Sequence, residues 1–471
     1  MMNKTVRMIT WYVLLTSAFS VTPLVHAQPK ECSADRDAWI VESQEAWLQA
    51  RDTAENLEIK DGFVEPTQGS SQFGSIVKRY KEKRKATSIT FKQSPVWENW
   101  KAVPNIGPKQ TADAPVFIPV GDKDYWFLAR CTRKEESNGG KMVPGYHAWH
   151  STDMKTWKHY GPVSDERSRW VTTAEYVDGT FYIYYDHPND EDPHLLLDKD
   201  LTDGKMGEDM GMAFADPSHG SDCAIIRDED GTFHLIYENW SYMDARKHSW
   251  DGPVGGHAAS SDGIHDFKIL DPVVDDRTTP TGRFAQFDHP HNPVKMKYEI
   301  HEPEQNAYGD YTAIKIGSQY YLFCDYHPAG ETIRIGRWTS GSLNEQFTWC
   351  GELGRGHPDP TVGFAEGRFY LIVQSGKNDY VSPGPWVDGV EARVGVDTSG
   401  DGKVDQWTDW QEVKETYEHK PGFVRIVETT PASIDLKSLS AGYGFKYEFK
   451  MTDTTENKSK PIMEQVKLTF Q

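Results

Sequence analysis

The sequence predicts an all-β protein: a five-bladed β-propeller with an N-terminal helical segment and a C-terminal β extension. The main observation is a repeat. At five places a short polar residue is followed, about ten residues later, by a run of aromatic and branched residues, with a turn signal between them. The second observation is composition, because 12% aromatic residues, 39 Gly and 27 Pro suit a β protein rich in turns.

The first element is a predicted export signal at residues 1–27, which would take the chain to the periplasm or outside the cell. Lys4 and Arg7 provide a positive start, and the apolar run that follows is too short for a comfortable membrane span. Small residues at the cleavage positions end at Ala27, which predicts a mature chain beginning at Gln28. No later stretch is apolar and long enough to cross a membrane.

Residues 28–95 are predicted to be helical. Ser33 is a suitable N-cap with Asp35 in the first turn, and apolar residues fall near one face of a helix over 33–57. A second, very basic helix is predicted over 75–85. These helices would pack under the propeller or join two copies of the chain in a homodimer.

Residues 96–410 carry the repeat and are predicted to form the propeller. Two strands joined by a dipeptide such as Asp178-Gly179 or Glu366-Gly367 form a hairpin. Hairpins that recur at about 50 residues, or more with insertions, are typical of propeller blades. Five copies predict five blades, whose leading polar residues are Asp113, Thr173, Asp222, Asp310 and Asp359.

The leading residues are expected to converge, because the innermost strand of each blade lines the central axis and begins at one face. Four of the five are acids. Carboxylates that converge repel one another, which separates an acid from a base. A single Asp at a strand start more often caps a turn, but four in register favour a functional site.

A long insertion at about 270–305 interrupts the propeller and is expected to influence specificity, since face loops carry function. Residues 411–471 are predicted to add at least three strands as the C-terminal extension. A segment shortly before this extension has oxygen-bearing residues at alternate positions and Gly at the sixth position. This spacing resembles that of a calcium loop. Its candidate ligands are Asp397, Ser399, Asp401 and Asp405, and a hairpin turn is the alternative.

The net charge of −20 argues against nucleic acid and anionic membrane surfaces as partners. It does not exclude a sulfated or carboxylated sugar, because local Arg and Lys residues can form a basic pocket. No cofactor is expected to be required, and a structural calcium ion is the one candidate.

The blade pattern resembles the five-bladed propeller glycoside hydrolases of families 43, 117 and their relatives, over residues 105–385. The resemblance implies that Asp113, in Asp113-Ala-Pro, is the general base and that Asp222 orients the acid and tunes its pKa. The family often carries the acid in a Glu-Gly-Pro motif, where this chain has Gly309-Asp310. Asp310, then Glu302, then His301 are the candidates for the acid.

Further residues are expected at the funnel as sugar-binding groups, by their places beside the leading acids. These are His219, His301, His357, Asp359, Thr173 and Trp240.

The predicted function is therefore hydrolysis of a terminal glycosidic bond in a plant or red-algal oligosaccharide. Families 43 and 117 invert the anomeric configuration, and the resemblance implies the same outcome here. Two alternatives remain open: a polysaccharide lyase with a His or Tyr base, and a propeller that binds sugar without cleaving it.

Overall fold

The computed structural model describes residues 37–67, 69–93, 100–103, 106–108, 114–131, 145–164, 169–187, 191–218, 220–242, 251–287, 296–301, 306–354, 359–374, 379–381, 390–452 and 463–471. The predicted signal peptide lies outside these ranges. Among the described residues α1 (Gln44–Ala50) is the only helix, and strands make up the rest of the regular structure, so the prediction of an all-β protein is confirmed. No helix in these ranges is long and apolar enough to cross a membrane.

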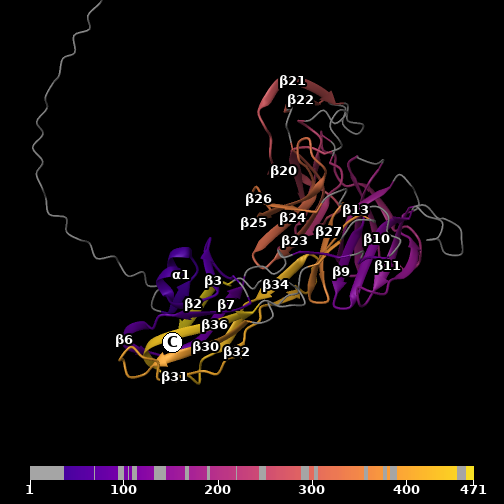
Figure 1. Ribbon diagram of the computed structural model, residues 1–471. Helices are drawn as coiled ribbons and strands as arrows, with labels where there is room; N and C mark the ends of the chain where they lie inside the picture. The colour runs from indigo at the N-terminus through magenta and orange to yellow at the C-terminus, as the bar shows by residue number, and fades with distance from the viewer. Residues whose placement is uncertain are drawn as a thin grey trace, which may run out of the picture.

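Five sheets form one body of the molecule (Figure 1). The first is β9 (Val116–Gly121), β10 (Asp124–Cys131), β11 (Gly145–Ser151) and β12 (Lys158–Pro162). The second is β13 (Trp170–Val177), β14 (Thr180–Asp186), β15 (Pro193–Asp198) and β16 (Glu208–Met212). The third is β17 (Ala224–Arg227), β18 (Phe233–Asn239), β19 (Val254–Ser260) and β20 (Lys268–Asp275).

The fourth and fifth sheets follow the same plan. The fourth contains β23 (Ala307–Ile316), β24 (Gln319–His327), β25 (Arg334–Ser340) and β26 (Thr348–Leu353). The fifth contains β27 (Thr361–Ala365), β28 (Arg368–Ile372) and β29 (Asp379–Val381). Its outer strand is β8 (Lys101–Val103), which precedes the first sheet in the chain and pairs antiparallel with β29.

The first strands of the five sheets contact one another in a closed order: β9, β13, β17, β23, β27 and again β9. Threonine hydroxyls join several of these neighbours. Thr173 Oγ1 accepts a hydrogen bond from the next sheet's Ile225 N–H at 3.2 Å, and Thr312 and Thr361 make the equivalent bonds to Val362 and Phe117. Because no ladder connects the sheets there, these bonds fix the height of neighbouring inner strands.

The predicted turns join the first two strands of the sheets. Asp178 and Gly179 have φ of 48° and 85°, and Glu366 and Gly367 have φ of 48° and 68°. Two successive residues in the left-handed region are what a two-residue hairpin loop requires.

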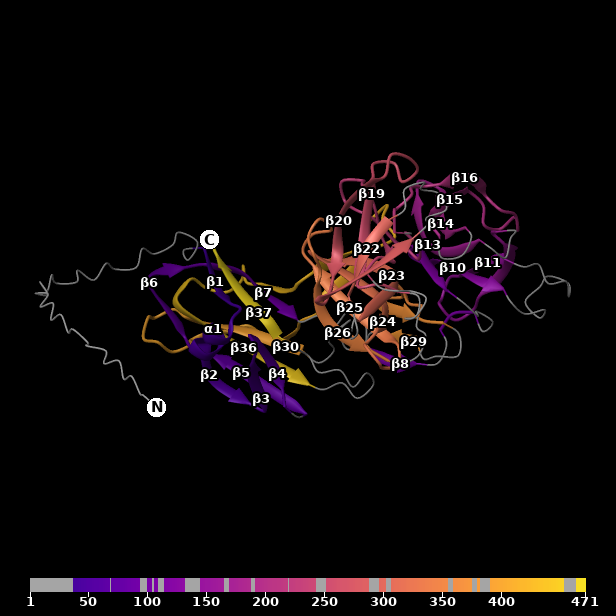
Figure 2. The ribbon, with the colours of Figure 1, turned by 90° about the horizontal axis from the view of Figure 1, so that it is seen from above.

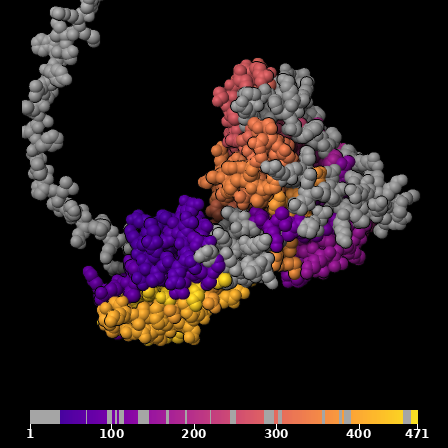
Figure 3. Space-filling view, in the orientation of Figure 1, coloured from indigo at the N-terminus to yellow at the C-terminus, as the bar shows by residue number. Residues whose placement is uncertain are grey.

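A second body contains the strands from both ends of the chain, which pack together in Figure 3. One of its sheets holds β1 (Ala38–Val41), β3 (Leu57–Lys60), β4 (Phe63–Pro66), β7 (Ala86–Gln93), β35 (Ala432–Asp435) and β37 (Met463–Phe470). The other holds β2 (Arg51–Glu55), β5 (Ser70–Ser75), β6 (Lys78–Arg84), β30 (Val390–Asp397), β31 (Gln406–Trp407), β32 (Gln411–Glu412) and β36 (Gly442–Thr452). Figure 2 shows this body beside the five sheets.

The predicted N-terminal helical segment is therefore wrong in most of its length. Only α1 is helical, capped by Ser43, whose Oγ accepts from Ala46 N–H at 3.2 Å. Residues 78–84, expected in a helix, form the edge strand β6. These residues form strands because they pair and pack with the far end of the chain, where Phe449 contacts Phe73 and Phe91. The predicted dimer through N-terminal helices loses its basis.

The two bodies also do not divide the chain at residues 95 and 410, the predicted domain boundaries. β30, expected in the propeller, pairs with β36 in the second body. Conversely, β33 (Thr416–His419) and β34 (Ile426–Thr430) extend the fourth sheet, where β34 runs parallel to β23. The C-terminal segment thus crosses between the bodies.

One hairpin projects from the five sheets, at the top of Figure 1. It consists of β21 (Pro280–Phe287) and β22 (Met296–His301), from the predicted insertion, and the two strands pair only with each other among the described residues.

Candidate active site

Three of the predicted leading acids share an unusual backbone conformation: Asp222 and Asp359 lie two residues before the inner strands β17 and β27, and Asp310 is the fourth residue of the inner strand β23. Asp222, Asp310 and Asp359 have φ of 43°, 47° and 33°. Residues other than Gly seldom adopt this region, and they are held there only by their surroundings. At each of these acids the surrounding structure supplies the same restraint.

The restraint is a hydrogen bond from the backbone N–H to a carboxylate of the preceding sheet. Asp222 N–H donates to Asp186 Oδ2 at 3.0 Å, and Asp310 N–H donates to Glu238 Oε1 at 2.7 Å. Asp359 N–H donates to Asp325 Oδ1 at 3.0 Å. Each acceptor is a carboxyl oxygen, and the bond is stronger than a neutral one when that carboxyl is ionised.

The accepting carboxylates were missed in the sequence, although a signal was present. Asp186, Glu238 and Asp325 each stand five residues after the first aromatic residue of their strand, at 181, 233 and 320. They therefore occupy one equivalent position at the end of the second strand. An alignment of the repeats would have shown an acid at this position in three of them, which indicates a shared role.

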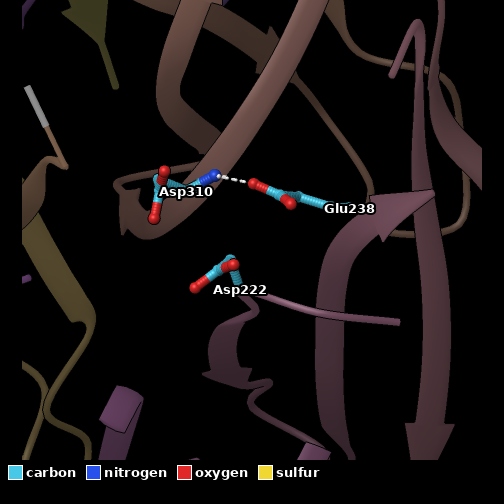
Figure 4. Close-up of side chains that lie close together, drawn as sticks. All are labelled: Asp222, Glu238 and Asp310. Atoms are coloured by element: carbon cyan, nitrogen blue, oxygen red, sulfur yellow. Dashed lines mark hydrogen bonds between the residues drawn. The ribbon is translucent and has the colours of Figure 1, made fainter. Parts of the chain in front are cut away.

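Asp222, Glu238 and Asp310 form the first group of acids, shown in Figure 4, with carboxylate oxygens within 4.8 Å of one another. Asp222 comes from the third sheet and Asp310 from the fourth. Glu238 is only 2% exposed, and its Oε2 accepts from Ser221 Oγ and Trp240 Nε1, both at 3.1 Å. The predicted convergence of leading acids is thus present for this pair.

Asp310 also belongs to a second group, with Asp325 and Asp359, whose oxygens lie within the same 4.8 Å. Burial, and then the nearby charges of Asp310 and Asp359, raise the pKa of Asp325 well above its ordinary value. Asp310 is therefore shared between two acidic groups. Oxygens at this spacing also suit a hard cation such as Ca²⁺.

Gly309, which precedes Asp310 in the segment where the family resemblance placed the acid, has no room for a side chain. An ideal Cβ there would lie 2.0 Å from Glu238 Oε1 and 2.5 Å from Asp251 Cγ. The space beside Gly309 is thus filled by two carboxylates of the third sheet, one on β18 and one three residues before β19. Asp251 in turn pairs with His327, with Oδ2 and Nε2 2.6 Å apart.

Several predicted residues take other places. Thr173 is buried, and its hydroxyl joins two inner strands as described above, so it aligns with Thr312 and Thr361 and not with the leading acids. His301 lies at the base of the projecting hairpin, where its N–H donates to Tyr242 O at 2.8 Å. Trp240 is partly buried and close to the acids through its bond to Glu238. The predicted residues outside the described ranges are Asp113, Glu302, His219 and His357.

The predicted calcium loop is held by its own backbone. Asp397 Oδ1 accepts from Gly400 N–H at 2.6 Å and Oδ2 from Gly402 N–H at 2.7 Å, while Asp405 Oδ2 accepts from Thr398 N–H at 2.7 Å. Ser399 Oγ donates to Asp397 Oδ1, and Asp401 accepts from Lys403 N–H. These carboxylates do not converge as they lie, since neither group of close acids among the described residues includes them. Calcium binding here stays a prediction.

Comparison with known proteins found glycoside hydrolases among the solved structures. No protein-family model matches the sequence, and no curated protein is similar to it. An endo-arabinase from Bacteroides thetaiotaomicron matches with a TM-score of 0.39 and 12% identity, over 60% of this chain and 97% of that one. A GH43_1 enzyme from Xanthomonas citri bound to xylose matches at 0.38 and 13%, over 61% and 90%.

An exo-β-1,3-galactanase from Phanerochaete chrysosporium matches at 0.39 and 9%, over 81% of this chain and all of that one. Family 43 is thus among the structures similar to this chain, as the sequence predicted. At this identity and TM-score a likeness does not establish what a chain does, so we infer the function from the site itself.

Proposed function

We propose that this protein is an exported glycoside hydrolase that removes a terminal sugar from an oligosaccharide of plant or red-algal origin. The observation that carries the proposal is the approach of Asp222 and Asp310. Asp222 lies two residues before β17 and Asp310 lies within β23, on two neighbouring sheets, and their carboxylate oxygens come within 4.8 Å of one another. In this proposal the five sheets are the five blades of a propeller, and its axis opens where these acids meet.

The chemistry of glycoside cleavage suits such a pair. The reaction passes through an oxocarbenium-like state and needs a proton for the leaving oxygen. Two carboxylates this close disfavour being ionised together. The pair therefore retains a proton, which Asp310 donates while Asp222 orients it.

The water-activating base in this proposal is Asp113, one residue before the described Ala114 at the start of the first sheet. The first and fourth sheets do not adjoin in the order of inner-strand contacts. A base and an acid on separated blades leave space for a water molecule, which supports inversion of the anomeric centre.

Cleavage at a chain end is supported by the hairpin β21–β22. Its base is joined through His301 to Tyr242, four residues beyond Glu238. In this proposal the hairpin restricts one side of the site, as an enzyme that removes terminal sugars requires.

The test is a product assay with purified protein on arabino-, xylo-, galacto- and agaro-oligosaccharides. Wild type is expected to release a monosaccharide, and Asp310→Asn and Asp222→Asn to lose roughly 10²–10⁴-fold in rate, the usual contribution of acid–base catalysis. Asp435→Asn, a surface change in the second body, is the matched control and keeps the wild-type rate.

Full activity of Asp310→Asn and Asp222→Asn would overturn the assigned acid pair. Binding of sugar with no release by wild type would indicate a binding propeller. An unsaturated, ultraviolet-absorbing product would indicate a lyase.

A further inference from the structure

At three junctions between sheets, the N–H of a leading acid donates to a carboxylate of the preceding sheet. At one of these junctions the accepting side chain is longer than at the other two. Asp186 and Asp325 are aspartates, and each accepts the N–H of the leading acid in the next sheet. At the junction of the third and fourth sheets the acceptor is Glu238. The extra methylene extends its carboxylate over Gly309, the position where a Cβ would collide with it.

Glu238 is hydrogen-bonded to one acid of the proposed catalytic pair and to the residue that precedes the other. Its Oε1 accepts from Asp310 N–H at 2.7 Å. Its Oε2 accepts at 3.1 Å from the hydroxyl of Ser221, which directly precedes Asp222 in the chain. One carboxylate therefore connects the starts of two inner strands that belong to different sheets.

The lone pairs of Glu238 are directed at donors. Besides Asp310 and Ser221, the indole Nε1 of Trp240 donates to Oε2 at 3.1 Å, and the residue is 2% exposed. A carboxylate that accepts three hydrogen bonds in the interior is fixed in place. At 2% exposure it is poorly placed to reach a leaving group.

We infer that Glu238 is a positioning residue that sets the distance between Asp222 and Asp310 and acts on the reaction only through them. This inference rests on the proposed function, because it assigns a role within the same site. Without Glu238, Asp310 loses the partner of its strained backbone N–H, and Ser221 loses its link to the fourth sheet. A misplacement of about 1 Å in an active site costs about 100-fold in rate.

The test compares Glu238→Gln with Glu238→Ala. Glutamine keeps the length and an acceptor oxygen for Asp310 N–H, but it has no acidic proton. For a positioning role, we expect Ala to lower kcat about 100-fold with little change in KM, and Gln to recover most of that loss. Equal inactivity of the two variants would show that Glu238 itself donates the proton, which would overturn the inference.

A second variant guards against a folding defect in Glu238→Ala, which leaves a buried space and unpartnered donors. Ser221→Ala removes one support and leaves the carboxylate its other two partners. We expect Ser221→Ala to lower kcat by less than Glu238→Ala and to leave KM unchanged. Unchanged kcat in both Ser221→Ala and Glu238→Ala would overturn the inference.

A spectroscopic measurement separates this inference from the proposed function. In protein labelled with ¹⁵N-aspartate, the Asp310 amide proton is expected far downfield, because its acceptor is a carboxylate, and to move upfield in Glu238→Ala. If wild type cleaves no oligosaccharide but this shift is seen, the proposed function fails while the positioning holds. If wild type is active and the shift is absent, the positioning fails.

Discussion

Arg425 Nη2 donates a hydrogen bond of 3.1 Å to the backbone carbonyl of Ala174, which joins the C-terminal segment to an inner strand of the second sheet. Its Nη1 reaches the carbonyls of Ala313 and Val362, in the fourth and fifth sheets, at 3.5 and 3.4 Å. One buried guanidinium thus contacts three of the five inner strands.

Two of the carbonyls that Arg425 contacts lie on the inner strands that carry or follow leading acids. Ala313 and Val362 each follow a leading acid, Asp310 or Asp359, by three residues, roughly 10 Å of strand. Burial raises the pKa of the adjacent Glu175, and the charge of Arg425 opposes that shift. Three inner strands are therefore joined, further along from the acids, by a residue of the C-terminal segment that lies between β33 and β34 of the fourth sheet.

The first prediction concerns Arg425. Arg425→Met removes the donors and leaves Glu175 buried without its counter-charge, so we expect unfolding free energy to fall by about 3–5 kcal/mol. Urea unfolding followed by tryptophan fluorescence measures this. Addition of Glu175→Gln to Arg425→Met should recover part of the loss. Lys437→Met, which breaks an exposed pair with Asp435, is the control and should change stability by less than about 1 kcal/mol.

The second prediction concerns Gly309. Its backbone does not have a positive φ, so Gly309→Ala acts only through the added methyl, which displaces the carboxylates of Glu238 and Asp251. We expect kcat to fall about 100-fold, as for a misplacement of about 1 Å, with a small change in melting temperature. Gly341→Ala, where nothing lies within 4 Å of the new Cβ, is the matched control. Wild-type kcat in Gly309→Ala would show that the placement of Glu238 does not matter.

The third prediction is a pH dependence of stability from Glu415, which is 4% exposed. Burial raises its pKa from 4.5 to about 7, against the hydrogen bond from Tyr417. The unfolded chain therefore ionises at lower pH than the native chain, and the contribution present below pH 4.5 is lost as pH rises through about 7. At about 1.4 kcal/mol per pKa unit, the loss amounts to about 3 kcal/mol.

Glu415→Gln stays neutral and should not show this loss. Unfolding curves at pH 5 and pH 8 check it: the variant gains stability relative to wild type at the higher pH. A constant difference between the two proteins at both pH values would contradict the raised pKa of Glu415.

The fourth prediction concerns the loop around Asp397. Because Asp397 accepts two backbone N–H bonds with its two oxygens, Asp397→Ala should lower stability by about 1–3 kcal/mol. A bound calcium ion, which the residue spacing predicts, would add about 2.7 kcal/mol at a hundredfold excess over Kd. Melting temperatures measured with Ca²⁺ and with a chelator distinguish a calcium site from a simple turn. A higher melting temperature with Ca²⁺ that Asp405→Asn abolishes would support a calcium site. Equal melting temperatures would indicate a turn held only by its own hydrogen bonds.

The sequence by itself determined the features that depend on neighbouring residues. The turn at Asp178-Gly179 and the strands beside it follow from local backbone preference and from alternation of apolar residues. Because each repeat contains the same local pattern, the repeat also aligned Asp222, Asp310 and Asp359 at equivalent positions, and their backbone conformations agree. The repeat thereby predicted that Asp222 and Asp310 lie close together.

Only the tertiary structure decided which distant segments meet. The N-terminal residues became strands because Phe73 and Phe91 pack on Phe449, some 360 residues later, and no local pattern contains that partner. Glu238 and Arg425 escaped notice for the same reason: each is an ordinary charged residue until folding sets it against Asp310 or Ala174. A buried charge acquires its role from groups that are distant along the chain, since burial and hydrogen-bond partners are properties of the assembled sheets.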